Sequence, residues 1–154
     1  MELVLYTDGS CLANPGPGGW AWACELGWMS NGSHATTNNA MELLAILEAL
    51  KAAQEAGAES VVIRTDSQYS IDALTKWIHG WRKRNWTTAS GSPVANRETI
   101  EAIHRVSGLL TVRYEKVKAH AGHEWNERVD DLARRQATAW REGRGRLAGP
   151  GLVT

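Results

Sequence analysis

A chain of 154 residues, 43% of them hydrophobic, is long enough to bury one self-supporting core, so the sequence predicts a single domain. Lysine plus arginine and aspartate plus glutamate each number 17, which excludes a global field that would draw the molecule to nucleic acid. No apolar run approaches the ~20 residues of a membrane span, and the two cysteines, Cys11 and Cys24, read as free thiols. We therefore expect a soluble, cytoplasmic protein that does not bind membranes.

The first half of the chain predicts three strands and a helix. Residues 3–7 form an apolar run typical of a buried strand, and the proline and glycine residues that follow indicate a turn. A second strand is predicted over residues 20–25, with a short third strand near Trp28. Residues 40–56 carry apolar side chains at helical spacing, and Gly57 is placed to end that helix in a left-handed conformation.

The second half predicts two further strands and several helices. Residues 61–65 form a β-branched strand, a helical stretch runs on through Leu74, and residues 110–117 alternate as a last strand. The order predicts an α/β protein with a central five-stranded mixed sheet, in which three antiparallel strands are followed by parallel ones, flanked by helices. We expect residues 1–141 to form the domain and the glycine-rich residues 142–154 to be a disordered tail. One face of the closing helix carries Val129, Leu132, Ala133, Gln136, Ala137 and Trp140.

Two of the predicted strands end in the same way. The strands at residues 3–7 and 61–65 each end in a threonine followed by an aspartate, Asp8 and Asp66. If the helix between them is a right-handed crossover, the two strands lie parallel and both aspartates leave the same edge of the sheet. Neighbouring carboxylates repel and need a cation between them, and oxygen ligands favour Mg²⁺ or Mn²⁺ over Zn²⁺. Each aspartate also has a structural interpretation, because Asp8 before glycine suits a turn and Asp66 before serine suits a helix N-cap.

Two more acids have equally ordinary interpretations. Glu42 lies in the first turn of the predicted helix at residues 40–56, and Asn39 three residues earlier fits a capping box. Asp130 lies on the closing helix four residues before Arg134, a spacing typical of an exposed ion pair. Spacing alone makes neither acid catalytic.

Long sequence motifs resemble those of type 1 ribonuclease H. The opening match, residues 7–19, reads Thr-Asp-Gly-Ser-Cys-Leu-Ala-Asn-Pro-Gly-Pro-Gly-Gly. The resemblance covers roughly residues 1–140 and is closest to the bacterial enzymes. It implies the ribonuclease H-like fold, with Asp8, Glu42, Asp66 and Asp130 as a metal-binding tetrad. Further matches follow in order at residues 36–42, 65–69, 77–81, 118–123 and 126–130.

The resemblance implies an endonuclease that hydrolyses the RNA strand of RNA/DNA hybrids by two-metal-ion catalysis and leaves 5′-phosphate and 3′-hydroxyl ends. Two Mg²⁺ ions are expected in the catalytic complex, with Mn²⁺ able to substitute, and the protein is expected to be a monomer. His120 matches the family's mobile histidine, which assists proton transfer or product release. Without the resemblance, His120 and His123 read as polar loop residues rather than as a zinc site.

The resemblance also implies how the hybrid is recognised, since 2′-hydroxyls are presented in a wide minor groove. Amide side chains are expected to contact this groove, a threonine and an asparagine to hold a DNA phosphate, two aromatic rings to line a deoxyribose channel, and a basic protrusion, the handle, to lie along the duplex. Residues 73–97 carry five basic side chains and no acid, which supports the handle. The implied substrate-binding residues are Asn14, Thr37, Asn38, Gln68, Tyr69, Trp77, Trp81, Arg82, Lys83, Arg84 and Asn96.

Some of these residues have structural alternatives, and the chain departs from the family at two places. Asn14 and Asn38 also suit a turn and a helix cap, and packing is a better explanation for Trp81 than base stacking. Ala35 replaces a basic residue often seen two positions before the phosphate-pocket threonine, and residues 87–92 carry no lysine. We expect weaker salt dependence than a fully basic handle would give.

Two other functions fit part of the pattern. A nuclease of the same fold, such as a Holliday-junction resolvase, would share the aspartates at the strand ends but not the motif at residues 36–42 or the handle. A catalytically silent hybrid-binding module would be expected to lack one of the four acids, and all four are present.

Overall fold

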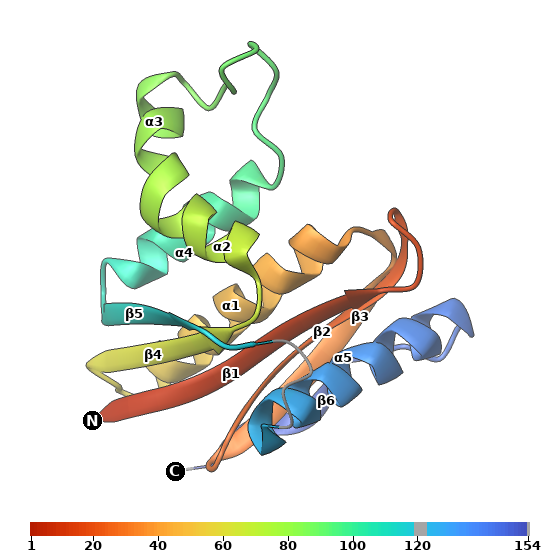
Figure 1. Ribbon diagram of the computed structural model, residues 1–154. Coiled ribbons are helices and arrows are strands. Elements are labelled where there is room, and N and C mark those ends of the chain that lie inside the picture. The colour runs from red at the N-terminus through yellow and green to blue at the C-terminus, as the bar shows by residue number, and fades with distance from the viewer. Residues whose placement is uncertain (119–122, 154) are drawn as a thin grey trace.

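The computed structural model of the chain describes residues 1–118 and 123–153. Their strands are β1 (Glu2–Cys11), β2 (Gly16–Cys24), β3 (Gly27–Thr36), β4 (Ser60–Thr65), β5 (Thr111–Lys116) and β6 (Ala148–Leu152). Within these described ranges the strands form one sheet in the order β5-β4-β1-β2-β3-β6. β1 pairs antiparallel with β2 and parallel with β4, so the expected change from antiparallel to parallel pairing is confirmed (Figure 1).

Helices cover both faces of the sheet. They are α1 (Asn38–Glu55), α2 (Gln68–Asp72), the π-helical η1 (Ala73–Trp77), α3 (Ile78–Lys83), α4 (Arg97–Ser107) and α5 (Glu124–Arg141). Side chains of β2 alternate between two cores: Trp20 and Trp22 pack into the larger one with α1, whereas Ala21 and Ala23 pack against α5. Figure 1 shows α1 and α5 on opposite sides of the central strands. Within the described residues, no helix is both long and apolar enough to cross a membrane.

Several local predictions are confirmed. Gly57 follows the end of α1 with φ of +82°, the left-handed conformation that favours glycine. Cys11 and Cys24 are free. β3 is longer than the short strand expected near Trp28, because its polar second half pairs with β2 and gives no apolar signal of its own.

In the part of the chain that the structure describes, the sheet has six strands, and the expectation of five is wrong. The additional strand, β6, lies inside the segment expected to be a disordered tail, and it pairs antiparallel with β3. Gln136 on α5 also donates a hydrogen bond from Nε2 to the Arg146 carbonyl oxygen at 2.6 Å. An uncovered β3 would present unpaired backbone groups along its edge, and the tail satisfies them. A prediction from side-chain composition missed this strand because its contribution is made by the backbone.

The topology places two acids at one edge of the sheet. Leu5 of β1 pairs with Ile63 of β4 in parallel register, so both strands run toward the same edge. Asp8 lies in the second half of β1, and Asp66 follows the last residue of β4. Because α1 connects β3 to β4, its amino-terminal end reaches the same edge.

Candidate active site

Three carboxylates from three different elements converge at this edge. Asp8 comes from β1, Glu42 from α1 and Asp66 from the residue after β4, and one carboxylate oxygen from each lies within 4.8 Å of the others. Asp8 is 4% exposed and Glu42 is 9% exposed, so two of the three groups are buried. The expectation that the two aspartates would leave the sheet side by side is confirmed.

A glycine allows the strand and the helix to approach each other here. A Cβ atom at Gly9 would lie 2.6 Å from the carbonyl carbon of Met41, so only glycine lets β1 pass α1 at this distance. The helix starts with Thr37, whose Oγ1 accepts a hydrogen bond of 3.2 Å from the Ala40 amide. These two features place Glu42 beside Asp8.

The structural interpretations of the three acids are wrong. Asp8 lies within β1 and not in a turn. Ser67, not Asp66, is the N-cap of α2, and it accepts a hydrogen bond from the Ser70 amide at 3.1 Å. Thr37 caps α1, so Asn39 lies inside the helix and forms no capping box with Glu42.

Asp130 lies in the same cavity but outside the tight cluster. It lines a cavity of about 570 Å³ together with Asp8, Glu42 and Asp66. The expected ion pair is also present, since Arg134 Nη2 lies 3.0 Å from Asp130 Oδ2. Asp130 therefore forms the predicted helical ion pair and also lines the acidic cavity.

Two further charged side chains line the cavity, Glu127 and Arg134. The sequence indicated Arg134 only as an ion-pair partner, and Glu127 was missed. Their spacing was the available signal, because residues 127, 130 and 134 recur at i, i+3 and i+7 and so share one face of α5.

Burial and mutual repulsion shift the carboxyl groups toward their protonated forms. Burial raises the pKa of Asp8 from 3.8 to about 7; a hydrogen bond with Glu42 opposes this and the charge of Asp66 adds to it. The pKa of Glu42 is raised well above its ordinary value, first by burial and then by the charge of Asp8. The cluster thus holds protons near neutral pH unless another cation replaces them.

The donor set fits a hard divalent cation. Glu42 Oε2 and Asp130 Oδ2 are buried oxygens that accept no hydrogen bond from any described residue, and the Arg134 contact to the latter lacks hydrogen-bond alignment. Cys11 lines the cavity, but its thiol donates to the carbonyl oxygens of Gly16 and Thr36, each at 3.3 Å. The available ligands are therefore carboxylate oxygens, which suit Mg²⁺ or Mn²⁺ rather than Zn²⁺.

The model of the RNase H family matches residues 1–138 of this chain. The chain belongs to the RNase H family. Ribonuclease H from Anaeromyxobacter dehalogenans strain 2CP-1 is 48% identical over 97% of this chain and 84% of its own length. Ribonuclease H from Thermus thermophilus is 49% identical over 88% of this chain and 84% of its own length.

Solved structures agree with this assignment. The crystal structure of LC9-RNase H1, described as a type 1 RNase H with the type 2 active-site motif, superposes with a TM-score of 0.74 at 29% identity. It covers 97% of this chain, and the match spans 78% of that chain. LC11-RNase H1 in complex with an RNA/DNA hybrid has a TM-score of 0.64 over 86% of this chain and 94% of its own, but at 24% identity it supports the fold alone. RNase H enzymes are generally metal-dependent, and the acidic cluster is compatible with that requirement.

Three residues expected to bind substrate in this RNase H chain meet beside the acidic cavity. Asn14 Oδ1 accepts a hydrogen bond of 3.1 Å from the backbone amide of Asn38, and Thr37, the residue before Asn38, is the N-cap of α1. Asn38 itself lines the cavity. The Asn14 side chain therefore joins the turn after β1 to the start of α1. Asn14 thus has a structural role in this turn as well as its predicted role in binding the hybrid.

The expected deoxyribose channel and phosphate pocket lie in contact through one hydrogen bond. The rings of Tyr69 and Trp77 meet edge to face with centroids 5.9 Å apart, and Trp77 is 43% exposed. Asn96 Nδ2 donates to the Tyr69 hydroxyl at 3.1 Å. Gln68 accepts from Lys116 Nζ at 3.3 Å.

The segment predicted to form the handle includes α3, and its basic side chains are exposed. Trp81 packs against the main core and Trp86 is 9% exposed, so packing is the role that the structure gives both rings. The three basic side chains after Trp81 are exposed, and within the described ranges none of them forms an ion pair: Arg82, Lys83 and Arg84. His120, the remaining predicted site residue, lies outside the described residues.

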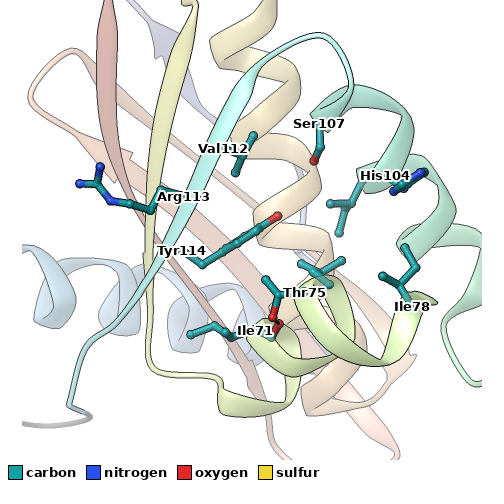
Figure 2. Close-up of a pocket in the computed structure, with 10 residues that line it drawn as sticks. Ile71, Thr75, Ile78, His104, Ser107, Val112, Arg113 and Tyr114 are labelled. Carbon is teal, nitrogen blue, oxygen red and sulfur yellow. Dashed lines mark hydrogen bonds between the residues drawn. The ribbon is translucent and has the colours of Figure 1, made fainter. Parts of the chain in front are cut away.

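A second cavity, of about 560 Å³, lies away from the acids. Tyr114 and Val112 of β5 line one side of it, and side chains of α2, η1 and α4 line the others (Figure 2). Burial raises the pKa of the Tyr114 phenol, which a hydrogen bond with Ser107 partly opposes. No described acid lines this cavity, so it offers no metal ligands like those of the acidic cavity.

Proposed function

We propose that the protein is a metal-dependent endonuclease that hydrolyses the RNA strand of RNA/DNA hybrids and leaves 5′-phosphate and 3′-hydroxyl ends. The observation that carries this proposal is the convergence of Asp8, Glu42 and Asp66 within 4.8 Å, in a cavity that Asp130 also lines. Four carboxylates have no structural use for such proximity, because their repulsion costs stability unless cations offset it.

These four acids would hold two Mg²⁺ ions, and Mn²⁺ is expected to substitute because it accepts the same oxygen ligands. When bound, divalent ions supply Lewis-acid activation of water and offset the charge that develops on the phosphate and on the leaving oxygen. The protein's own contribution is to fix ligands on a strand, a helix and a strand end, so that the cavity is shaped before substrate arrives.

Substrate recognition is proposed to use both sides of the cavity. Asn14, Asn38 and Gln68 offer amide groups for the minor groove: Asn38 lines the acidic cavity, Asn14 is hydrogen-bonded to it, and Gln68 begins α2 two residues after Asp66. Thr37 and Asn96 are proposed to hold a DNA phosphate. Tyr69, which accepts a hydrogen bond from Asn96, would line the deoxyribose channel together with Trp77.

The basic handle is proposed to bind phosphates of the duplex rather than bases. Arg82, Lys83 and Arg84 are exposed, whereas Trp81 is partly buried and packs against the core. Loss of the basic residue at Ala35 leaves phosphate binding to the remaining hydrogen-bond donors. His120 is proposed to assist proton transfer or product release.

We further propose that the enzyme acts as a monomer, because the four carboxylates all come from one chain. The cytoplasmic location expected from the sequence stays a prediction.

The test is cleavage of a labelled RNA/DNA hybrid in Mg²⁺, with duplex DNA and duplex RNA as parallel substrates. RNA-strand cleavage of the hybrid alone is expected, with products that carry 5′-phosphate ends. Absence of cleavage, or equal cleavage of duplex DNA, would refute the proposal. Asp8→Asn is expected to abolish turnover while hybrid binding is kept, and an active Asp8→Asn variant would show that the metal site is misassigned.

A further inference from the structure

One cationic side chain projects into the acidic cavity. Among the described residues that line it, five are acids and the only cation is Arg134. A guanidinium placed there offsets part of the repulsion between the carboxylates when no metal ion is bound.

The contact between Arg134 and Asp130 is close but replaceable. Nη2 lies 3.0 Å from Asp130 Oδ2, yet its alignment is not that of a hydrogen bond. The Arg134 side chain is 60% exposed, whereas that of Asp130 is 17% exposed. The guanidinium can therefore turn into water at little cost, because ion pairs with one solvated partner contribute little stability. Asp130 Oδ2 would then be open to another cation.

Asp130 also stands apart from the other three acids. Asp8, Glu42 and Asp66 form the tight cluster, and Asp130 lines the same cavity but has Arg134 as its counter-charge. We propose that Arg134 is a built-in counter-ion that competes with divalent metal for Asp130 and so lowers the affinity of the site for metal. This inference rests on the proposed metal-dependent function and adds to it a residue that regulates metal affinity.

The direction of the effect follows from electrostatics. A divalent ion entering the cavity is attracted by the carboxylates and repelled by the guanidinium, so removal of the guanidinium strengthens metal binding. If Arg134 instead served to position Asp130 as a ligand, its removal would weaken metal binding. The two roles therefore give opposite signs.

The chain contains a matched control on the same helix. Arg135 Nε pairs with Asp131 Oδ2 at 2.8 Å with the same i, i+4 spacing, and both side chains are exposed. Neither residue lines the acidic cavity. Arg135→Gln removes the same charge from the same helix without altering the cavity.

The experiment is calorimetric titration of the substrate-free protein with MnCl₂ and, separately, with MgCl₂, at low salt. Arg134→Gln is expected to tighten metal binding by roughly tenfold, an order of magnitude set by one partly screened charge. Arg135→Gln should change affinity by less than about twofold, and Arg134→Lys, which keeps the charge, should stay near the wild type. In an Asp130→Asn background, the effect of Arg134→Gln should shrink.

Unchanged or weaker metal binding in Arg134→Gln would overturn the inference, and so would an equal gain in Arg135→Gln. Circular dichroism of each variant checks folding. Because the Arg134 side chain is 60% exposed, Arg134→Gln is expected to fold like the wild type. A wild-type protein that binds no divalent ion and cuts no hybrid would instead refute the proposed function. A wild type that does both, with Arg134→Gln indistinguishable from it, would refute this inference alone.

Discussion

At the scale of single residues, the two buried carboxyl groups, Asp8 and Glu42, carry an electrostatic cost, because burial disfavours their charged forms. Burial raises the pKa of both groups; the charge of Asp8 raises the pKa of Glu42 further, whereas a hydrogen bond with Glu42 partly lowers that of Asp8. A protein selected only for stability would replace one of them by an amide or an apolar group. Their presence is explained by the cation that they are proposed to bind.

This cost predicts how the stability of the metal-free protein depends on pH. The folded-state pKa of Asp8 is about 7 against an ordinary value of 3.8, so the folded state binds more protons than the unfolded state between these pH values. Stability of the metal-free protein should therefore fall as pH rises from about 4 to about 7, by at most about 4 kcal/mol from this group. Thermal melts in EDTA at pH 5 and pH 7.5 measure the change.

Asp8→Asn is the control, because an amide does not titrate. Its melting temperature should fall less between the two pH values than that of the wild type, and it should exceed the wild-type value at pH 7.5. A wild type whose melting temperature rises over this range relative to Asp8→Asn would contradict the raised pKa.

Gly9 predicts a second effect at the same site. In Gly9→Ala, the new Cβ would lie 2.6 Å from the Met41 carbonyl carbon, so β1 and α1 must separate. We expect a loss of about 2 kcal/mol or more in unfolding free energy and a fall in turnover of at least tenfold, because Glu42 moves away from Asp8. Urea denaturation and steady-state cleavage measure the two. Gly80→Ala is the control, since a Cβ there meets only the flexible Arg84 side chain at 3.1 Å and adds helix propensity.

At the scale of elements, β6 shows how a strand with little apolar sequence signal can complete a sheet mainly through backbone hydrogen bonds, with Leu152 packed against the main core. β6 covers the edge of β3, and Val153 donates a backbone hydrogen bond of 2.7 Å to the Leu26 carbonyl oxygen. Gln136, 7% exposed, joins α5 to this segment through its amide group. The tail therefore completes the edge of the sheet next to β3, separated by β2 and β3 from the β1 strand that carries Asp8.

Removal of residues 147–154 should consequently lower stability without altering the site. We expect the unfolding free energy to fall by roughly 1 to 3 kcal/mol, the range for loss of several backbone hydrogen bonds and of cover over Trp28. Urea denaturation measures this loss, and metal affinity of the folded truncated protein should match that of the full chain. An unchanged unfolding midpoint would mean that β6 is dispensable, as a disordered tail would be.

The sequence predicted the elements that carry strong periodic signals, and it did so for physical reasons. β1 and β4 are apolar runs that end in Thr-Asp, and α1 has a continuous buried face, so the crossover and the pairing of Asp8 with Asp66 followed. β6 could not be predicted in this way, because its pairing depends on an edge created by residues more than a hundred positions away. Local pattern does not encode which edges are left open.

The residues of the candidate site also differ in whether local sequence pattern could place them. Asp8 and Asp66 could be placed from strand order, whereas Glu42 and Asp130 had ordinary helical interpretations that spacing could not exclude. The cap at Thr37 rather than at Asn39 removed one of these interpretations, and only the structure showed which residue caps the helix. For Asp130, the predicted ion pair with Arg134 is present, but this prediction was incomplete. The spacing of the pair along the helix could not show that Asp130 also lines the acidic cavity.

At the scale of the whole molecule, charge is balanced overall and uneven locally. The chain has 17 basic and 17 acidic residues, so long-range attraction to a polyanion must come from an uncompensated patch. In the described residues, five acids line one cavity, and Arg82, Lys83 and Arg84 lie exposed on the handle. The handle would attract the phosphates of a duplex, whereas the acidic cavity would repel them until cations entered the cavity.

This arrangement predicts a salt dependence that belongs to the handle and not to net charge. Replacing Arg82, Lys83 and Arg84 together by serine should raise KM for a hybrid several-fold at low salt, leave kcat within about twofold, and reduce the slope of log(kcat/KM) against log salt by about 2 to 3. Cleavage kinetics between low and moderate salt measure this slope. The matched control replaces three other exposed arginines by serine: Arg135, Arg141 and Arg144. This variant loses the same total charge, but from α5 and the segment after it. Equal losses of slope in the two triple variants would mean that global charge, and not contact between the handle and phosphates, governs association.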